Sequence, residues 1–475
     1  MTALVAVLVA AALAAPVEAL TADDLFDDRE LHDIWIHMNA RDWAQLRATY
    51  MENTFYPCDV EWRGLKVRNA GCRSRGTGTR NGVKPGLRLD FNHYVAAQEL
   101  LGLEGAVLDN LWQDGSMLKE RLAMRLFDHL EVPAPRTTYV RLYIGSDRTY
   151  IGLYALVEEI DETFARRQFG RGDGYLYEYR WKDEYRFEDL GPELEPYAYR
   201  FEPRTRVRES MFSLYAPIRD LVQAINEADE GELEAALAPH LDLRMLVTQL
   251  AVENYLADWD GLLGYAGLSN FYLHRSADGG PFHVLPWDKD TTFAWLHMPP
   301  WHNVEDNVLG RKLWNDRRLR ADYLAALLEA ASAAADLEGE ALRAVQQIHD
   351  AAVEDPLKPY SNEQFEEAVA DVVEFARHRA AIVRRFVREI GSVADAGPRV
   401  QRPGDRDELP FVAVAEGEPQ DAEHGAANLA VRPRTPELVQ HGASGADDEL
   451  PQSARWVRAA VGILGRKPFV HMIVP

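Results

Sequence analysis

Acidic and amide side chains gather in two segments in the second half of the chain. The first is Asp258-Trp259-Asp260-Gly261, and the second runs from Asn270 to Asp290. Carboxylate and amide oxygens are the ligands that a hard cation such as Mg²⁺ prefers in proteins. A metal ion and one spare carboxylate are also the minimum that phosphoryl transfer requires. The residue types therefore indicate metal-assisted chemistry.

The segment from residue 270 to residue 290 is predicted to form a β-hairpin. Two apolar and aromatic runs flank the sequence Ala-Asp-Gly-Gly, which is typical of a tight turn. A turn centred on the Asp-Gly pair places Asn270 opposite Trp287 or Asp288, with paired Cβ atoms about 5 Å apart. We therefore expect Asn270 and Asp288 to meet at the open end of the hairpin, with Asp290 just beyond.

These acids also have a purely structural explanation. Asp-Gly and Asp-Trp-Asp sequences occur in solvated turns, and an aspartate after a strand often caps the next helix. Trp287 favours the functional interpretation, because an apolar wall beside acids is typical of a cleft.

A glycine-rich basic segment runs from Arg73 to Gly86 and precedes a predicted strand at residues 87–91. Its glycines permit close approach of the backbone, and its interleaved cations, including Arg75, could cradle phosphates. The segment matches neither a Walker A motif nor a GxGxxG sequence that enters a helix. A solvated basic hairpin tip is the alternative.

Other elements must position these segments. An apolar helix at residues 245–256 is predicted to deliver the Asp258 cluster, and the Trp- and His-rich residues 295–314 could cover a cleft. The remaining predictions are a strand at 33–37, a short helix at 40–50, a hairpin at 59–67, a helix at 115–130, strands at 139–144 and 150–157, a helix opening at 158–161, and long helices at 317–334 and 362–390.

The two cysteines, Cys58 and Cys72, flank the predicted hairpin at residues 59–67. Two cysteines alone cannot form a structural zinc site with four ligands. In an oxidising compartment we expect a disulfide that braces the hairpin, and free buried thiols are the alternative.

Composition limits the class of partner. The net charge of −24 argues against binding to nucleic acid or to anionic membranes, because no compensating basic stripe accompanies it. The length of 475 residues is sufficient for two or three structural units.

Both ends of the chain differ from its centre. Residues 1–19 resemble a secretory signal peptide, with an apolar run from Ala3 to Ala15 before the cleavage pattern that ends at Ala19. An N-terminal anchor is the alternative, but the run is shorter than the roughly 20 residues of a span. We expect a secreted or cell-envelope protein without a stable membrane span. Residues 392–475, rich in Gly, Pro, Ala and acids, are predicted to be a disordered tail.

The order of the motifs resembles the CotH kinase family, the spore coat protein H-like atypical protein kinases. The matching pieces are RSRGTGTRNGVKPGLRLDF, LDNLWQDGSMLKERLAMRLFDHLEVPAPRTTYVRLYIG, YIGLYALVEEIDETFARRQFG, ADWDG and NFYLHRSADGGPFHVLPWDKDTTF. The resemblance implies an α+β, two-lobed, highly diverged protein-kinase-like fold at residues 29–391. Its strand-rich N-terminal lobe would cover about 29–180 and its helix-rich C-terminal lobe about 181–391.

The resemblance also implies roles for individual residues. Lys84 would contact the phosphates of ATP with Arg75 nearby, and Glu158 would position the lysine or the metal. A further set would carry the chemistry: Asp260 as the catalytic-loop acid, Asp288 of PWDKD as the Mg²⁺ ligand, and Asn270 as its assistant.

Two hypotheses follow from the resemblance and the residues together. In the first, the protein is an exported Ser/Thr kinase that uses ATP and Mg²⁺, with Mn²⁺ as an alternative, on secreted or surface proteins. In the second, it is a noncatalytic surface or coat protein, a pseudokinase whose acids bind a divalent cation or cap structure. Retention of the whole Lys, Glu, Asp, Asn and Asp set favours the first.

Overall fold

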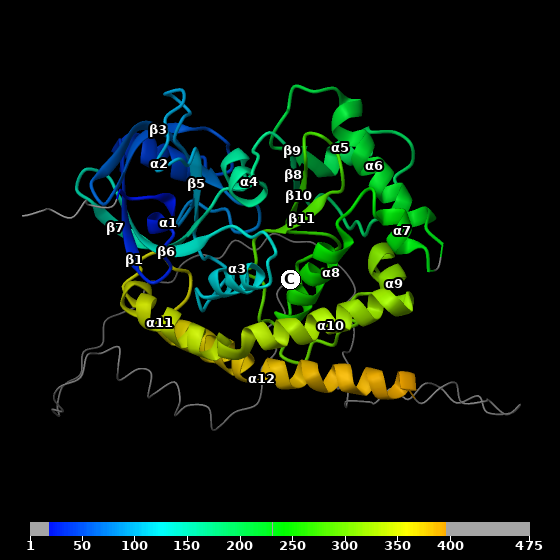
Figure 1. The fold of residues 1–475 in the computed structure, drawn as a ribbon. Coiled ribbons are helices and arrows are strands. Elements are labelled where there is room, and N and C mark those ends of the chain that lie inside the picture. The colour runs from blue at the N-terminus through cyan, green and yellow to red at the C-terminus, as the bar shows by residue number, and fades with distance from the viewer. Residues whose placement is uncertain (1–18, 230, 396–475) are drawn as a thin grey trace, which may run out of the picture.

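Seven strands close into a barrel in the N-terminal third of the chain (Figure 1). The computed structural model describes residues 19–229 and 231–395. The barrel order is β1-β2-β3-β4-β5-β7-β6, and β1 closes it by pairing in parallel with β6. Its strands are β1 (Leu31–Met38), β2 (Tyr56–Trp62), β3 (Leu65–Arg75), β4 (Gly86–Asp90), β5 (Gly105–Asp109), β6 (Thr137–Ile144) and β7 (Thr149–Val157).

Local sequence explains much of the barrel. The predicted hairpin at residues 59–67 is confirmed, because Trp62 pairs with Leu65 across a turn whose residues Arg63 and Gly64 both have positive φ. Two residues with positive φ are typical of the type I′ turn that matches strand twist. The predicted strands at 33–37, 139–144 and 150–157 correspond to β1, β6 and β7.

A second sheet of four strands has the order β11-β10-β8-β9. It contains β8 (Tyr175–Tyr179), β9 (Phe201–Pro203), β10 (Phe271–Arg275) and β11 (His283–Pro286). Phe271 pairs with Pro286 and Tyr272 with Leu285, so the hairpin is centred on its Asp-Gly pair as predicted. β8, which ends just before the expected lobe boundary at about residue 180, forms its backbone hydrogen bonds with β10 instead of with the barrel.

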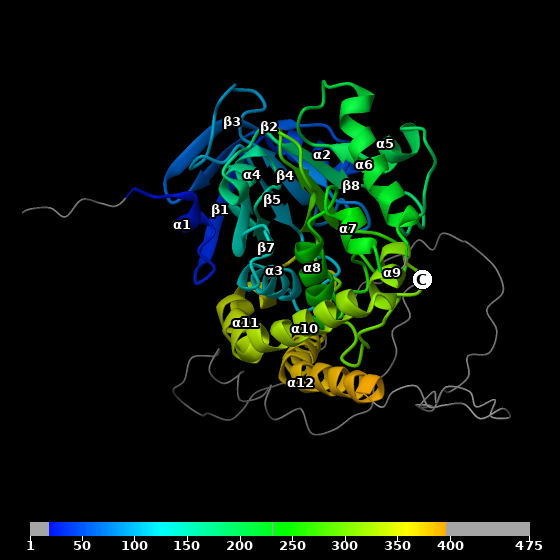
Figure 2. The ribbon, with the colours of Figure 1, turned by 45° about the vertical axis from the view of Figure 1, so that its right-hand side comes forward.

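Helices form the rest of the described chain. In Figures 1 and 2, α10, α11 and α12 form a layer below both sheets, and α3 and α8 lie between that layer and the sheets. The helices are α1 (Ala22–Leu25), α2 (Ala40–Ala48), α3 (Lys119–His129), α4 (Glu162–Phe169), α5 (Glu195–Arg200), α6 (Met211–Glu227), α7 (Leu233–Leu237), α8 (Leu243–Tyr255), α9 (Val308–Asn315), α10 (Arg317–Ala333), α11 (Leu337–Val353) and α12 (Asn362–Asp395), with a 3₁₀ turn at Ala334–Asp336.

The long helices at residues 317–334 and 362–390 are confirmed by α10 and α12. The helix predicted from residue 115 begins later, at Lys119. Asp114 is the reason, because its carboxylate accepts from the backbone N–H of Ser116 and of Lys119 and holds the intervening residues in a turn.

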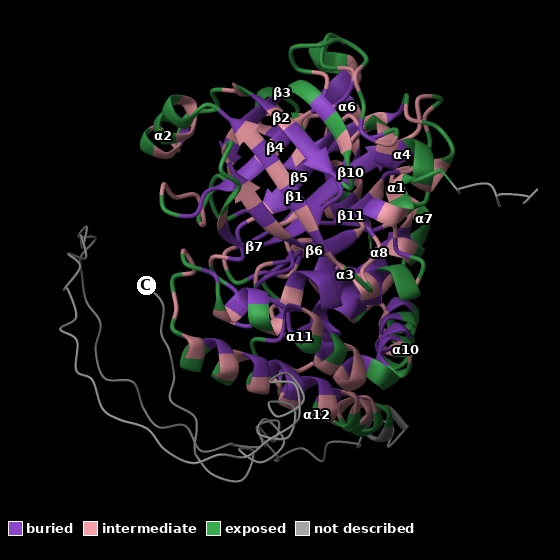
Figure 3. Cartoon of the chain, turned by 90° about the vertical axis from the view of Figure 1, so that its left-hand side faces the viewer, coloured by how far each residue is buried: buried purple, intermediate pink, exposed green. Residues whose placement is uncertain are grey.

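Alternate residues of the barrel strands enter two different cores, and most of these residues are buried (Figure 3). On β5 and β7, Leu108 and Leu156 belong to the core inside the barrel. Their neighbours Val107 and Val157 belong to the larger core shared with the second sheet and the helices. The outer surface of β5 and β7 therefore faces the second lobe.

Cys58 and Cys72 are both buried free thiols, so the expected disulfide is absent from the structure. Cys58 pairs with Ala70 and Cys72 with Tyr56, which makes the two cysteines diagonal neighbours. Diagonal neighbours lie about 7–8 Å apart, beyond the usual Cα separation of a disulfide. A hydrogen bond with Cys58 and burial raise the pKa of the Cys72 thiol.

None of the described helices combines the length and apolarity that crossing a membrane requires. Residues 1–18 of the expected signal peptide lie outside the described residues, as do residues 396–475 of the expected tail. Helix α12 continues through Asp395, so the first residues of the segment expected to be disordered are helical.

Candidate active site between the two lobes

Asp260 and Asn270 meet at the end of helix α8 and the start of β10. The Asn270 Nδ2 atom donates to both Asp260 Oδ2 and the Asp260 carbonyl, at 3.0 Å each. Trp287 in turn donates its backbone N–H to the Asn270 carbonyl at 3.2 Å. The pairing of the hairpin thus brings Asn270 to the aspartate cluster, although the two segments are separate in the sequence.

Asp288 is partly buried and has a left-handed backbone with φ of 51°. Burial and the charges of Asp109 and Asp260 together raise the pKa of its carboxyl to about 7, against the opposing effect of Arg75. Asp109 comes from the end of β5 in the barrel. The two lobes therefore contribute carboxylates to one electrostatic site.

Two more acids extend this site. Burial and Asp288 raise the pKa of Glu120 to about 8, and the same two causes raise the pKa of Asp290 well above its usual range. Glu120 accepts the backbone N–H of Lys289, and Gln113 donates to Asp290 at 2.8 Å. Several carboxylates thus share a region with too little positive charge to ionise them all easily.

A buried lysine, Lys289, connects the two segments that contain the aspartates. Lys289 Nζ lies 2.9 Å from Glu253 Oε1 and 2.9 Å from Asp258 Oδ2, and its side chain is fully buried. Thr291 donates to the other Asp258 oxygen at 2.9 Å. Burial and Asp258 raise the pKa of Asp260 to about 6, and Lys289 opposes this rise. This network connects the PWDKD segment, residues 286–290, with the DWDG segment, residues 258–261.

Arginines line the barrel side of the same site. Arg73 on β3 is directly opposite Arg88 on β4, and Arg75 lies two residues further along β3. The Arg75 guanidinium lies 5.5 Å from the centroid of the Trp287 ring, and its Nη1 is 3.8 Å from Asp109 Oδ2. Arg75 thus connects the arginines with the acids, as expected for a residue beside a cofactor.

The arginines repel one another. Burial and the charges of Arg88, Arg80 and Arg75 together lower the pKa of Arg73 to about 10. Arg88 has an acidic partner, Glu159, at 2.6 Å. Within residues 19–229 and 231–395, the polar partners of Arg73 and Arg80 are carbonyl, amide and hydroxyl oxygens rather than carboxylates. This arrangement suits an added anion.

Lys84 has a different partner from the one expected. Its Nζ donates to Asp355 Oδ2 at 2.7 Å and to the Leu153 carbonyl at 2.8 Å, and both charged side chains are fully buried. The expected pairing with Glu158 is wrong. In this structure the Lys84 ammonium is enclosed and does not face the acids around Asp288.

Glu158 is held by two arginines. Arg136 and Arg167 each approach its carboxylate to 2.6 Å, and only 1% of its side chain is exposed. Both oxygens are engaged, so the carboxylate neither orients Lys84 nor remains free for a cation. The local sequence around Glu158, between a strand and a helix, does not indicate whether its partner is a lysine, a metal ion or an arginine.

Three polar residues near the site were missed by sequence reasoning. Asp109 follows the short apolar run of residues 106–108 and could have been noticed for that reason, but Glu120 looked like an ordinary polar position of an amphipathic helix. Asp355, in the Glu-Asp-Pro sequence after α11, carried no signal. Among the described residues, no group of three or more His, Cys, Asp or Glu side chains is arranged to hold a metal ion alone.

Two open hollows lie elsewhere. One of about 550 Å³ is lined by the loop at residues 170–174 with Arg166 and Arg206, and one of about 350 Å³ is lined by Arg136, Glu158 and Arg167. Neither is lined by Asp260, Asn270 or Asp288. We locate the candidate site by the convergence of acids and arginines rather than by the size of a hollow.

Comparisons with known proteins identify the family of this chain. Inner spore coat protein H of Bacillus subtilis (strain 168) is 22% identical over 368 residues, which span 74% of this chain and 96% of that protein. The crystal structure of the Helicobacter pylori proinflammatory kinase CtkA aligns with 67% of this chain and 95% of its own, at 11% identity and with a TM-score of 0.30. The family model described as CotH kinase protein matches residues 72–383, more than half of the sequence. The chain therefore belongs to the CotH kinase family.

Proposed function

We propose that this protein is an atypical protein kinase that transfers the γ-phosphate of ATP to Ser or Thr hydroxyls of exported proteins. One observation carries the proposal. A row of mutually repelling arginines on the barrel includes Arg75, and Arg75 lies beside Asp109, Trp287 and the Asp288 carboxyl, whose pKa is raised. The phosphates of a nucleoside triphosphate would supply negative charge to the arginines, and a divalent cation would supply positive charge to the carboxylates.

The donor set fits Mg²⁺ held together with a nucleotide. Asp288 would supply a carboxylate oxygen, and Asn270 would supply its amide oxygen, since its Nδ2 is already engaged by Asp260. Mg²⁺ usually takes one or two carboxylates plus substrate phosphates and water, so a complete protein cage is not required. When bound, the ion would neutralise charge on the β- and γ-phosphate oxygens.

The phosphate-binding cations in this proposal are arginines. Arg75 lies at the junction with the acids, and Arg73 and Arg88 extend the positive surface along β3 and β4. Arginine suits this task because its planar fork binds phosphate oxygens in pairs. Lys84, which the family resemblance assigned to the phosphates, would act indirectly.

Asp260 would orient the acceptor hydroxyl and receive its proton. Its carboxylate is fixed by Asn270 at 3.0 Å, and its pKa of about 6 keeps it largely ionised at neutral pH. A group with a pKa somewhat below the working pH can accept a proton in the transition state. Asp260 and the ligand residue Asn270 would thus act as one unit.

The sequence of the N-terminus and the nature of the relative support an exported substrate. Residues 1–19 resemble a signal peptide, and the relative in Bacillus subtilis is a spore coat protein. The noncatalytic alternative keeps the same acids as a site for a divalent cation without transfer.

The test is incubation of the purified mature chain with γ-labelled ATP and either Mg²⁺ or Mn²⁺. We expect label on Ser or Thr residues of the protein itself or of an added protein acceptor, identified by mass spectrometry. Asp260→Asn is the matched control, because it removes the proton acceptor and retains the shape. A wild-type chain that neither binds Mg²⁺–ATP nor transfers label would favour the noncatalytic alternative.

A further inference from the structure

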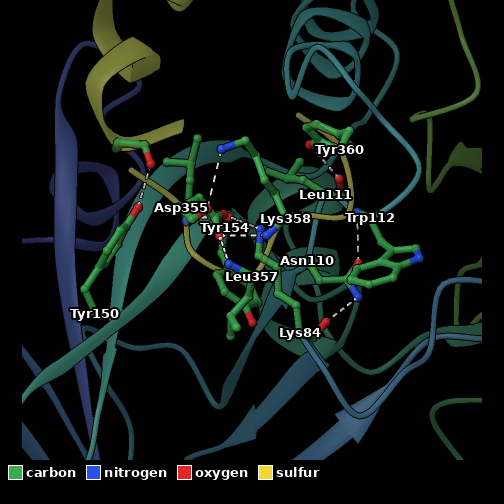
Figure 4. A network of polar contacts seen from close by, with 12 residues as sticks. Lys84, Asn110, Leu111, Trp112, Tyr150, Tyr154, Asp355, Leu357, Lys358 and Tyr360 are labelled. Carbon is green, nitrogen blue, oxygen red and sulfur yellow. Dashed lines mark hydrogen bonds and ion pairs between the residues drawn. The ribbon is translucent and has the colours of Figure 1, made fainter. Parts of the chain in front are cut away.

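The Lys84–Asp355 pair joins parts of the chain that are 271 residues apart (Figure 4). Lys84 precedes β4 in the barrel, and Asp355 lies in the loop between α11 and α12. Neither side chain has any exposed surface. The C-terminal helices thus insert a carboxylate into the barrel and place it against the last residue of the glycine-rich segment before Pro85.

Asp355 is held in one orientation by four further constraints. Its Oδ1 accepts the backbone N–H of Leu357 and of Lys358, and its Oδ2 accepts that of Leu153 at 3.0 Å. Gly152 makes room for it, with φ of 142°, because a Cβ there would lie 2.6 Å from both carboxylate oxygens. The backbone at residues 152–153 and 357–358 therefore both makes room for the Asp355 carboxylate and orients it.

Lys84 passes the constraint on to the glycine-rich segment and to β5. Its carbonyl accepts from Asn110 Nδ2 at 2.8 Å, and the same nitrogen donates to the Thr79 carbonyl at 3.1 Å. The backbone N–H of Lys84 donates to Asn81 Oδ1 at 2.8 Å. Asn110 directly follows Asp109, the acid closest to Arg75. One network therefore fixes residues 79–84 of the glycine-rich segment against Asn110, the residue that follows β5.

We propose that Asp355 is a positioning residue for the nucleotide site: through Lys84 and Asn110 it orders residues 76–84 and sets Asp109 and Arg75 against the acids of the second lobe. The inference rests on the proposed function and assigns a control point of the same site to the C-terminal helices.

A role limited to holding the C-terminal helices against the barrel explains the Lys84–Asp355 pair less well. Apolar side chains would dock the helices on the barrel without the desolvation penalty that a buried ion pair carries, so a buried pair is weak evidence for stability. A hydrogen-bonded charged pair instead fixes the orientation of its side chains. Both carboxylate oxygens of Asp355 accept backbone N–H groups, which holds the carboxylate in one orientation. The neighbouring contact from Tyr150 to the Ala351 carbonyl at 2.8 Å already links α11 to β7.

The experiment uses the full mature chain with Lys84→Met, Asp355→Asn and the double variant. Tyr150→Phe is the matched control, because it removes a hydrogen bond between the same two parts of the chain without touching Lys84. Hydrogen exchange of residues 76–84 is measured without nucleotide, and KM for ATP and kcat are measured separately. Thermal melting shows which variants are folded.

We expect exchange in residues 76–84 to become about tenfold faster in both single variants and in the double, and to stay unchanged in Tyr150→Phe. We expect KM for ATP to rise about 10- to 100-fold, as loss of supporting residues commonly does, with a smaller effect on kcat. Equal effects of the singles and the double would mean that Lys84 acts only through its partner.

Three results would overturn the inference. One is unchanged exchange in a folded Asp355→Asn or, if that variant does not fold, in Lys84→Met. Another is an equal increase in Tyr150→Phe, which would indicate adhesion alone. A third is a much larger loss of ATP binding in Lys84→Met than in Asp355→Asn, which would make Lys84 a direct phosphate ligand. Because exchange is measured without nucleotide, it separates this inference from a wild-type chain that fails to bind ATP, which would overturn the proposed function.

Discussion

Arg73 and Arg88 lie directly opposite each other on the neighbouring antiparallel strands β3 and β4. Like charges in this position destabilise a sheet by up to about 1 kcal/mol. Their proximity also lowers the pKa of Arg73, after burial has done so. A fold that retains such a pair is well adapted to an anion that binds both.

We expect Arg73→Met to stabilise the ligand-free protein, by about 0.5–1 kcal/mol, because it removes the repulsion. The same substitution should weaken binding of ATP and remove much of the thermal stabilisation that ATP produces. Urea unfolding with and without ATP measures both effects. Arg68→Met, at an exposed position of the same strand, is the control and should change neither. Loss of stability in ligand-free Arg73→Met would argue against strain at this pair.

Asp288 and Asp260 should differ in what they contribute. Asp288→Ala should abolish both Mg²⁺-dependent nucleotide binding and transfer, because it removes the metal ligand. Asp260→Ala should leave Mg²⁺–ATP binding largely intact while turnover falls by about 10²–10⁴-fold, the usual contribution of a general base. Calorimetric binding and single-turnover transfer distinguish the two. Equal loss of nucleotide affinity would make Asp260 a second metal ligand.

Lys289→Met should destabilise the protein strongly. The substitution leaves the carboxylates of Glu253 and Asp258 buried without their cation, and breaking a buried pair in this way typically loses about 3–5 kcal/mol. Lys66→Met offers the comparison, because the Lys66 side chain is 45% exposed and Glu61 keeps Arg148 as a partner, so the loss should be less than about 1 kcal/mol. Chemical unfolding at pH 7 gives both values, and similar losses would contradict the role assigned to Lys289.

His274 should make the protein less stable in acid. Burial and then His283 lower the pKa of His274 to about 4, and its ring stacks on Phe169 with 4.0 Å between centroids. Its other ring neighbour, His283, faces Asp242 at 3.4 Å. The unfolded chain binds the proton from about pH 6.5 downward and the folded chain only near pH 4, so stability falls across that window.

The loss attributable to His274 would be about 3 kcal/mol between pH 7 and pH 4. The measurement is the change in unfolding free energy with pH for the wild type minus that for His274→Phe, which retains an aromatic ring beside Phe169. Subtraction matters because Glu120 and Asp288, whose pKa values are raised, act with the opposite sign. Identical pH dependence in the two proteins would contradict the prediction.

Sequence patterns predicted elements whose geometry depends on near neighbours. The hairpin around Asp278 and Gly279 has the predicted register, because turn residues and alternating apolar residues determine which strand positions face each other. The same reasoning placed Asn270 beside Asp288, but the hydrogen bond of Asn270 with Asp260 came only from the structure. The helices predicted at residues 245–256, 317–334 and 362–390 correspond to α8, α10 and α12, which also depend on local sequence.

Partners of buried charges required the tertiary structure. Lys84 could have paired with any acid that packing brought near it, and helices far along the chain supplied Asp355 while Glu158 went to Arg136 and Arg167. The pairing of β8 with β10 in the second sheet also depends on packing between segments that are distant in the sequence. A side chain's type shows that it needs an opposite charge when buried, but only the arrangement of elements in space decides which charge satisfies it.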